Sequence, residues 1–180
     1  MVAVLLENGF EESEVIVPVD LLRRGKCDVR LVGIGGECVK SSRGVKLGTD
    51  CRLAEVDPTQ LELLFLPGGQ PGVNRLWENP EVRTFVQAAY GAGITLGAIC
   101  AAPIILGRLG MLEGKRATCY PGCQSELRGA LYSDEDVVCD GKMITGRAAG
   151  AAFPFGMALL RALRGDTVAR EVADSVCYED

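Results

Sequence analysis

The 180-residue sequence contains no histidine. Imidazole is the usual general base beside a serine or cysteine nucleophile and the commonest side-chain ligand of metals. Its absence excludes Ser-His and Cys-His catalysis and every metal site that needs an imidazole. Long apolar runs are missing as well. No stretch approaches the roughly 18 apolar residues of a membrane-spanning helix, so we expect no membrane partner.

Charge of one sign does not accumulate along the chain. The 19 Lys+Arg and 24 Asp+Glu residues give a net charge of -5, and the basic residues form only small pairs such as Arg23-Arg24. This balance disfavours nucleic acid as a partner. The N-terminus lacks the basic region and apolar core of a signal peptide. We therefore expect a soluble cytoplasmic protein, with residues 1–180 forming a single domain.

Cysteine, in contrast, is frequent, with eight residues scattered over the chain. In a cytoplasmic protein they are expected to be reduced thiols. Only Cys119 and Cys123 lie close together, and one C-x3-C pair without a second pair is weak evidence for a zinc site. We interpret these two as small apolar core residues. The sequence predicts no metal and no cofactor.

Short apolar runs alternate with segments of helical periodicity. The runs predict strands over residues 2–6, 28–34, 61–66, 94–99 and 116–119. The periodic segments predict helices over 11–24, 81–90, 101–109, 151–163 and 167–175, and hairpins are expected over 37–47 and 137–145. Such alternation predicts an α/β fold with a mostly parallel central sheet and helices on both faces. Functional sites in such sheets lie at the carboxyl ends of the strands.

The segment Gly97-Ala98-Ile99-Cys100-Ala101-Ala102-Pro103 carries the strongest chemical signal. An apolar strand runs directly into Cys100, and a helix of small residues is expected to follow. This is the strand-turn-helix pattern of a nucleophile elbow, although the G-x-S-x-G consensus is absent. A cysteine at a helix N-terminus is favoured as a thiolate, and the Ala101 N–H is expected to point at the developing charge. A buried structural cysteine is the alternative.

Two further motifs follow predicted strands. Leu66-Pro67-Gly68-Gly69-Gln70 offers backbone N–H groups for half of an oxyanion hole, or simply a turn that needs positive φ. Glu11-Glu12-Ser13-Glu14 begins a predicted helix, where acidic residues are expected on dipole grounds alone. If Glu14 points inward, desolvation raises its pKa and keeps it protonated, so that it can donate a hydrogen bond to a thiolate.

These three motifs together resemble the DJ/ThiJ/PfpI superfamily, in the branch of the parkinsonism-associated protein deglycase and the bacterial ThiJ-like proteins. The likeness extends over nearly the whole chain. It includes residues 18–25, 42–45 and 145–147. The resemblance implies a flavodoxin-like three-layer sandwich and a homodimer.

The resemblance also implies roles for individual residues. Cys100 matches the reactive, oxidisable cysteine of the family, and Glu14 matches the protonated carboxyl beside it. Gly69 and Ala101 match its backbone donors. The positions that match family residues near the dimer interface, where they hold a small anion, are Arg24 and Arg43.

One departure from the family pattern affects the chemistry. Tyr120 stands where many relatives place a histidine, so proton transfer is left to Glu14, water or the substrate. Tyr120 either orients a ligand through its hydroxyl or, as is commoner for an aromatic residue near a pocket, packs. A smaller departure is Ala148-Ala149-Gly150, where relatives often carry Gly-Pro-Gly.

Two functions remain open. The first is a cysteine-dependent enzyme that processes small reactive carbonyls, as a glyoxalase or deglycase does. The second is a non-catalytic redox sensor or stress-response chaperone that acts through oxidation of Cys100 by a small oxidant. Both predict a low thiol pKa. A role in thiamine metabolism ranks last, because nothing resembles a phosphate-binding P-loop.

Overall fold

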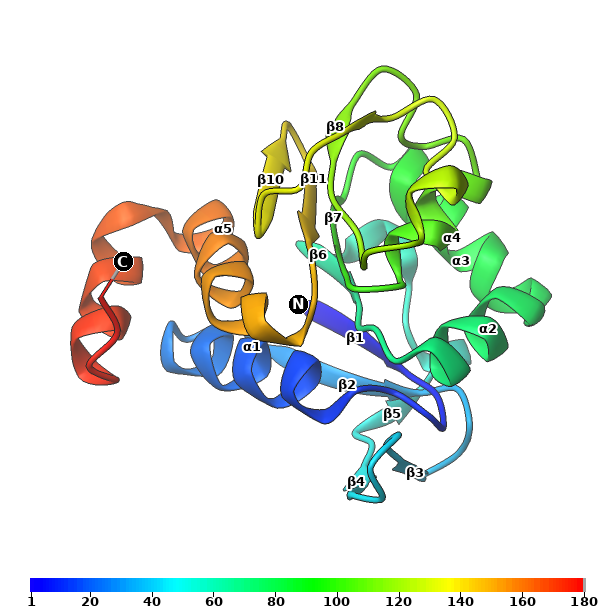
Figure 1. Ribbon diagram of the computed structural model, residues 1–180. Coiled ribbons are helices and arrows are strands. Elements are labelled where there is room, and N and C mark those ends of the chain that lie inside the picture. Colours follow the sequence, from blue (N-terminus) through cyan, green and yellow to red (C-terminus); the bar gives the residue numbers. More distant parts are fainter. Residues whose placement is uncertain (180) are drawn as a thin grey trace.

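The computed structural model describes residues 1–179, and a seven-stranded sheet forms its centre (Figure 1). The strand order is β10-β11-β7-β6-β1-β2-β5, and every neighbouring pair is parallel except β10 and β11. The strands of this sheet are β1 (Val2–Leu6), β2 (Val29–Gly33), β5 (Cys51–Arg52), β6 (Leu63–Leu66), β7 (Thr95–Ile99), β10 (Val137–Asp140) and β11 (Met143–Gly146). The predicted α/β fold with a mostly parallel sheet is confirmed.

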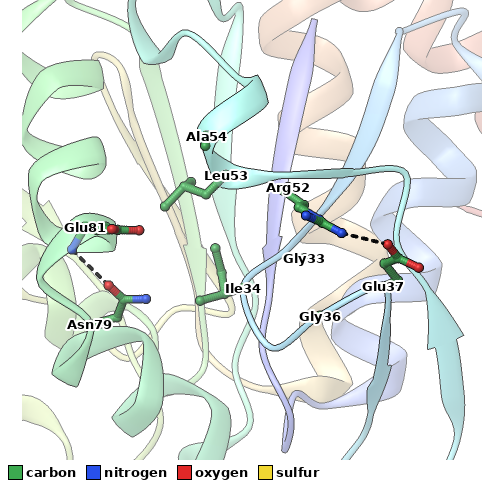
Figure 2. A pocket seen from close by; sticks show the side chains of 9 residues that line it. All are labelled: Gly33, Ile34, Gly36, Glu37, Arg52, Leu53, Ala54, Asn79 and Glu81. Atoms are coloured by element: carbon green, nitrogen blue, oxygen red, sulfur yellow. Dashed lines mark hydrogen bonds and ion pairs between the residues drawn. The ribbon is translucent and has the colours of Figure 1, made fainter.

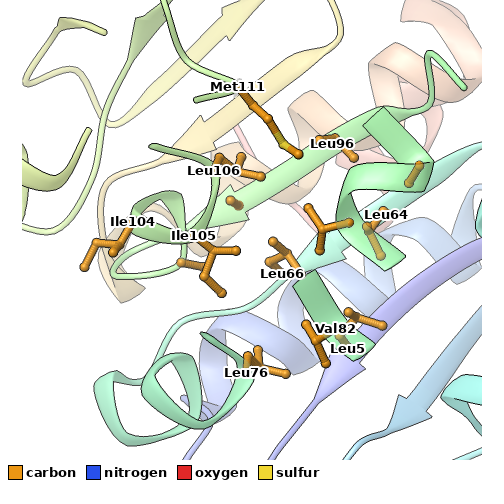
Figure 3. Packing of buried hydrophobic residues seen from close by; sticks show 14 of the residues in the cluster. Leu5, Leu64, Leu66, Leu76, Val82, Leu96, Ile104, Ile105, Leu106 and Met111 are labelled. Carbon is orange, nitrogen blue, oxygen red and sulfur yellow. The ribbon is translucent and has the colours of Figure 1, made fainter. Parts of the chain in front are cut away.

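Helices cover both faces of the sheet. The two groups are α1 (Glu12–Arg24) with α5 (Ala152–Ser175), and α2 (Gln70–Glu78), α3 (Pro80–Gly91) and α4 (Pro103–Arg108). Strand β1 shows why both faces are apolar: Ala3 and Leu5 pack among residues of α2, α3 and α4, whereas Val4 and Leu6 pack among residues of α1 and α5. Figure 3 shows the first of these two cores. A strand buried on both sides reads as a continuous apolar run.

Several element bounds differ from the sequence predictions. The hairpin expected over 37–47 is present as β3 (Cys38–Lys40) and β4 (Lys46–Gly48). The strand expected over 116–119 is only β8 (Arg116–Ala117), which pairs with β9 (Leu131–Tyr132) outside the main sheet. Helix α2 and strand β5 were not predicted. Short 3-10 turns cover Leu53–Glu55, Pro58–Gln60, Gln124–Glu126 and Ala149–Ala151.

Helix α5 is interrupted at Gly165, where φ is 81° and ψ is 173°. This combination is accessible essentially to glycine alone. The break separates the two helices that the sequence predicts over 151–163 and 167–175. Residues of both halves, including Leu160 and Val172, pack into the core around α1. No helix within residues 1–179 is both long enough and apolar enough to cross a membrane.

Candidate functional site

Cys100 stands at the corner where β7 ends and the chain turns toward α4. Its φ is 63°, in the left-handed region that residues other than glycine adopt at a cost. The backbone holds this corner in place, because the Cys100 N–H donates to the Gly146 carbonyl (2.9 Å) and the Ala102 N–H donates to the Ile99 carbonyl (3.0 Å). The helix begins at Pro103 and not at Ala101 as predicted, since proline suits the first helical turn.

Glu14 is brought to the same place from the first turn of α1. The residue is 1% exposed, and it shares the inner face of the helix with Val15. A Cβ atom built on Gly68 would lie 2.2 Å from Glu14 Oε2 and 2.6 Å from Cys100 Cβ. The carboxyl group and the reactive corner therefore lie against the same glycine. The inward orientation of Glu14, which the sequence only permitted, is present.

The surroundings of Glu14 favour its neutral form. Both carboxyl oxygens are buried, and neither has a hydrogen-bond partner of good geometry among residues 1–179. The Glu14 pKa is raised from 4.5 to about 7, chiefly by burial and to a smaller extent by the charge of Glu11, while hydrogen bonding to the Cys100 side chain and the Gly68 backbone acts in the opposite direction. A neutral carboxyl group has a proton to donate, and the thiol of Cys100 is the neighbouring reactive group.

The prediction of a low Cys100 pKa is wrong when Cys100 lies beside an ionised Glu14. Burial, and then the negative charge of an ionised Glu14, raise the Cys100 pKa from 9.0 to about 12, while the N–H groups of Gly69 and Ala101 lower it. The helix that follows is only six residues long and contributes too little to reverse this. A protonated Glu14 carries no charge that opposes the thiolate. The protonation of Glu14 therefore affects the pKa of the Cys100 thiol.

Cys100 opens into a cavity of about 390 Å³. Its lining residues are Glu11, Ser42, Arg43, Gly69, Gln70, Pro71, Cys100, Ala101 and Tyr120. Four of these, Glu11, Ser42, Gln70 and Pro71, were not predicted as site residues, although all four lie within or beside the quoted motifs. Glu14 is absent from the lining because it is buried behind the cysteine.

Gly69 contributes through its backbone. Its φ of 90° favours glycine, and a Cβ atom at this position would lie 2.4 Å from the Gly9 carbonyl oxygen. Glycine is therefore required at position 69 for two reasons: the backbone has a positive φ there, and residues 9–11 approach it closely. The N–H groups of Gly69 and Ala101 both lower the pKa of the Cys100 thiol.

Tyr120 and Arg43 lie at the cavity, whereas Arg24 does not. The Tyr120 N–H donates to the Cys100 carbonyl (2.8 Å), and its side chain is 49% exposed. Arg43 comes from the turn between β3 and β4, which is tied to the site because the Ser42 N–H donates to the Phe10 carbonyl (2.7 Å). Arg24 pairs with Asp20 at the far end of α1 and lines a different pocket.

A second hollow of about 490 Å³ lies at the carboxyl ends of β2 and β5 (Figure 2). Its charged side chains include the Arg52–Glu37 ion pair, in which both groups are largely exposed. Asn79 caps α3 at its other side by accepting from the Glu81 N–H. None of its lining residues is a cysteine or a buried titratable group. We therefore assign the candidate site to the smaller cavity at Cys100.

The other cysteines differ from Cys100 in their surroundings. Cys119 is fully buried and Cys123 is half-buried, and both pack in the core between the sheet and α4. Burial raises the pKa of each thiol. No group of three or more metal-ligating side chains occurs within the described part of the chain.

Comparison with known proteins identifies the architecture. Residues 1–162 match the model of the DJ-1/PfpI family. The chain belongs to this family. Protein dj-1beta of Drosophila melanogaster is 37% identical over 173 residues, which cover 94% of this chain and 92% of that protein. The glutathione-independent glyoxalase DJR-1.2 of Caenorhabditis elegans is 31% identical over 169 residues, covering 93% and 90%.

Solved structures agree with this assignment to the DJ-1/PfpI family. Drosophila melanogaster DJ-1beta superposes with a TM-score of 0.94 at 36% identity, covering 99% of this chain and 98% of that one. A cysteine-to-alanine mutant of a DJ-1 superfamily protein from Salmonella typhimurium gives a TM-score of 0.93 at 35% identity, with the same coverage. The flavodoxin-like fold that the resemblance implied is confirmed.

Proposed function

We propose that this DJ-1/PfpI protein is a cysteine-dependent enzyme that converts small 1,2-dicarbonyl compounds to 2-hydroxy acids. The observation that carries the proposal is the buried carboxyl group of Glu14 beside Cys100, whose oxygens have no hydrogen-bond partner of good geometry within residues 1–179, together with the N–H groups of Gly69 and Ala101, which lower the thiol pKa. A nucleophile, a proton carrier and an oxyanion site are thereby assembled without histidine. The glyoxalase name of the Caenorhabditis elegans relative supports this choice.

The reaction begins with addition of the Cys100 thiolate to the aldehyde carbon. The N–H groups of Gly69 and Ala101 stabilise the oxyanion that forms, and Glu14 then donates its proton to give a neutral hemithioacetal. The resulting Glu14 carboxylate removes the proton from the former aldehyde carbon, which gives an enediol, and returns it to the adjacent carbon, while the hemithioacetal hydroxyl proton passes through water to the oxygen of that carbon. The aldehyde carbon is oxidised and the ketone carbon reduced, so no external oxidant is needed. Water hydrolyses the thioester, which releases the hydroxy acid and restores the thiol.

Lactate formation from methylglyoxal, followed without glutathione, tests the proposal. We expect turnover in the wild type and none in Cys100→Ala or Glu14→Gln. Cys139→Ala is the matched control, because it removes an exposed thiol at a strand far from the cavity lining. Stoichiometric modification of Cys100 without any lactate would contradict the enzymatic proposal. Activity on glycated peptides, measured in the same series, extends the test to deglycase chemistry.

Redox sensing is a second candidate, and the same geometry favours it. A Cys100 sulfinate would accept hydrogen bonds from a protonated Glu14 and from the N–H groups of Gly69 and Ala101. Mass spectrometry after graded peroxide exposure tests this function: we expect two added oxygens at Cys100 before any at the other thiols. Uniform oxidation of all eight cysteines would reject it. A chaperone-like role requires, in addition, that the oxidised form suppresses aggregation of a test protein better than the reduced form.

We further propose a cytoplasmic homodimer. Support comes from Arg24, which lies outside the cavity of its own chain and approaches Cys100 only if a second copy brings it. Sedimentation analysis checks the association state. Arg24→Gln is expected to change Cys100 kinetics in a dimer, whereas Arg43→Gln is expected to change them in either state. The proposal would be rejected if the protein is a monomer and Arg24→Gln leaves the kinetics of Cys100 unchanged.

A further inference from the structure

The carboxylate of Glu11 connects the two halves of the site. Glu11 is the N-cap of α1, where its Oε2 accepts hydrogen bonds from the Glu14 N–H (2.9 Å) and the Ser13 hydroxyl (2.5 Å). Its own N–H donates to the Gly68 carbonyl (3.0 Å). The residue also lines the cavity into which Cys100 opens. Glu11 therefore contacts the element that carries the acid and the loop that carries an oxyanion donor.

Glu11 and Glu14 differ in exposure, in hydrogen bonding and in their position on the helix, and these properties decide which carboxyl group is charged. Glu11 is half-exposed, accepts two hydrogen bonds and stands at the positive end of a thirteen-residue helix. Glu14 is buried and has no hydrogen-bond partner of good geometry among residues 1–179. Two neighbouring carboxyl groups resist simultaneous ionisation. The proton is therefore expected on Glu14, the buried carboxyl group of the two.

We propose that Glu11 is a positioning residue that holds the proton on Glu14 and thereby leaves the negative charge of the buried pair on Cys100. This inference rests on the proposed function, because it concerns the state in which Cys100 is nucleophilic. When Glu14 and Cys100 together lose one proton, that proton can come from the carboxyl group or from the thiol. The fixed charge of Glu11 disfavours a second carboxylate on the same helix turn. Below the Glu14 midpoint the proton that the pair loses is therefore that of the thiol, while Glu14 keeps its own.

The other charged groups around Glu14 do not hold the proton on Glu14 in this way. On its own helix Glu12 has one buried oxygen without a partner of good geometry in the described chain, so it has no comparable network. From the β7–α4 corner Glu14 faces Cys100, the group to be ionised. From the β6–α2 loop Gly68 lies against it, and Gly68 carries no charge. Arg43, on the β3–β4 turn, is exposed and lines the cavity.

Glu11→Asp and Glu11→Asn form a matched pair of variants for the test. Aspartate and asparagine are equally good N-caps, so the variants differ in charge while both retain the helix. We expect the pH midpoint of the Glu14 carboxyl ¹³C signal, assigned by its loss in Glu14→Gln, to be about one pH unit lower in the Asn than in the Asp variant. Between the two midpoints, where Glu14 is ionised in the Asn variant and still neutral in the Asp variant, alkylation of Cys100 by iodoacetamide is expected to be about three- to tenfold slower in Glu11→Asn.

Equal Glu14 midpoints and equal alkylation rates in the two variants would overturn the inference and reduce Glu11 to a helix cap. This outcome is distinct from failure of the proposed function. If no variant produces lactate while the Glu14 midpoint still responds to the charge at position 11, the enzyme proposal fails and the positioning role stands. If lactate forms equally in both variants and the midpoint does not move, the enzyme proposal stands and the positioning role fails.

Discussion

Glu14 and Cys100 lie against one glycine. A Cβ atom on Gly68 would fall 2.2 Å from the Glu14 carboxyl and 2.6 Å from the Cys100 Cβ atom. The two side chains come from residues 86 positions apart in the sequence, on the first helix and after a central strand of the sheet. Their proximity is what allows one proton to be shared between a carboxyl group and a thiol.

Substitution of Gly68 is expected to disrupt this contact. In Gly68→Ala the new methyl group must displace Glu14, Cys100 or the Ile99 carbonyl, which would lie 2.9 Å away. We expect a loss of about 1–3 kcal/mol in unfolding free energy and slower alkylation of Cys100. Gly91→Ala is the control, because a Cβ atom there meets no atom within 4 Å. Equal behaviour of the two variants in urea unfolding would contradict this description of the site.

Glu14 makes the stability depend on pH in a definite direction. Its pKa is raised from 4.5 to about 7 in the folded protein, so the folded state binds more protons than the unfolded state between these values. The stabilisation is complete below pH 4.5 and is lost as the pH rises through 7. We expect the wild type to lose about 3 kcal/mol relative to Glu14→Gln over this range. Parallel unfolding curves for the two proteins at pH 4.5, 6 and 8 would refute the shift.

Tyr120 offers a way to restore the missing imidazole. The residue lines the cavity and its side chain is half-exposed, so histidine fits there without repacking the core. We expect Tyr120→His to raise kcat/KM for methylglyoxal by at least about tenfold above pH 6.5, because a general base contributes on that scale. Tyr120→Phe should retain wild-type activity. A large loss in Tyr120→Phe would instead assign the hydroxyl to catalysis.

Substitution of Gly165 tests the break in α5 independently of the site at Cys100. A Cβ atom at this position meets no atom within 4 Å, so Gly165→Ala is expected to act through backbone strain alone. We expect a loss of about 1–3 kcal/mol in unfolding free energy, with no change in the alkylation rate of Cys100. A substitution that is neutral for stability would show that the C-terminal half of α5 can adopt another geometry.

Patterns among residues close together in the sequence were sufficient to predict most of the helices and strands. The run Val2–Leu6 was predicted as a strand with the bounds that the structure has, because a strand buried on both faces needs apolar side chains at every position. Helix α1 ends at Gly25 as predicted. Helix α2 was missed because Gly72 opposes helix formation locally, although Pro71 stands in the first turn, where proline is favoured. Gly72 is required by a distant contact, since its Cβ atom would lie 2.9 Å from the Phe10 nitrogen.

Patterns among neighbouring residues were enough to specify the alternating elements and the corner at Cys100, and composition alone excluded an imidazole. The folded arrangement was needed to establish that Glu14 points inward, that Arg24 lies away from the cavity and that burial raises the Cys100 pKa. These properties depend on which surfaces meet when the helices pack on the sheet. Desolvation is a property of the assembled interior, and no local pattern of residues specifies it.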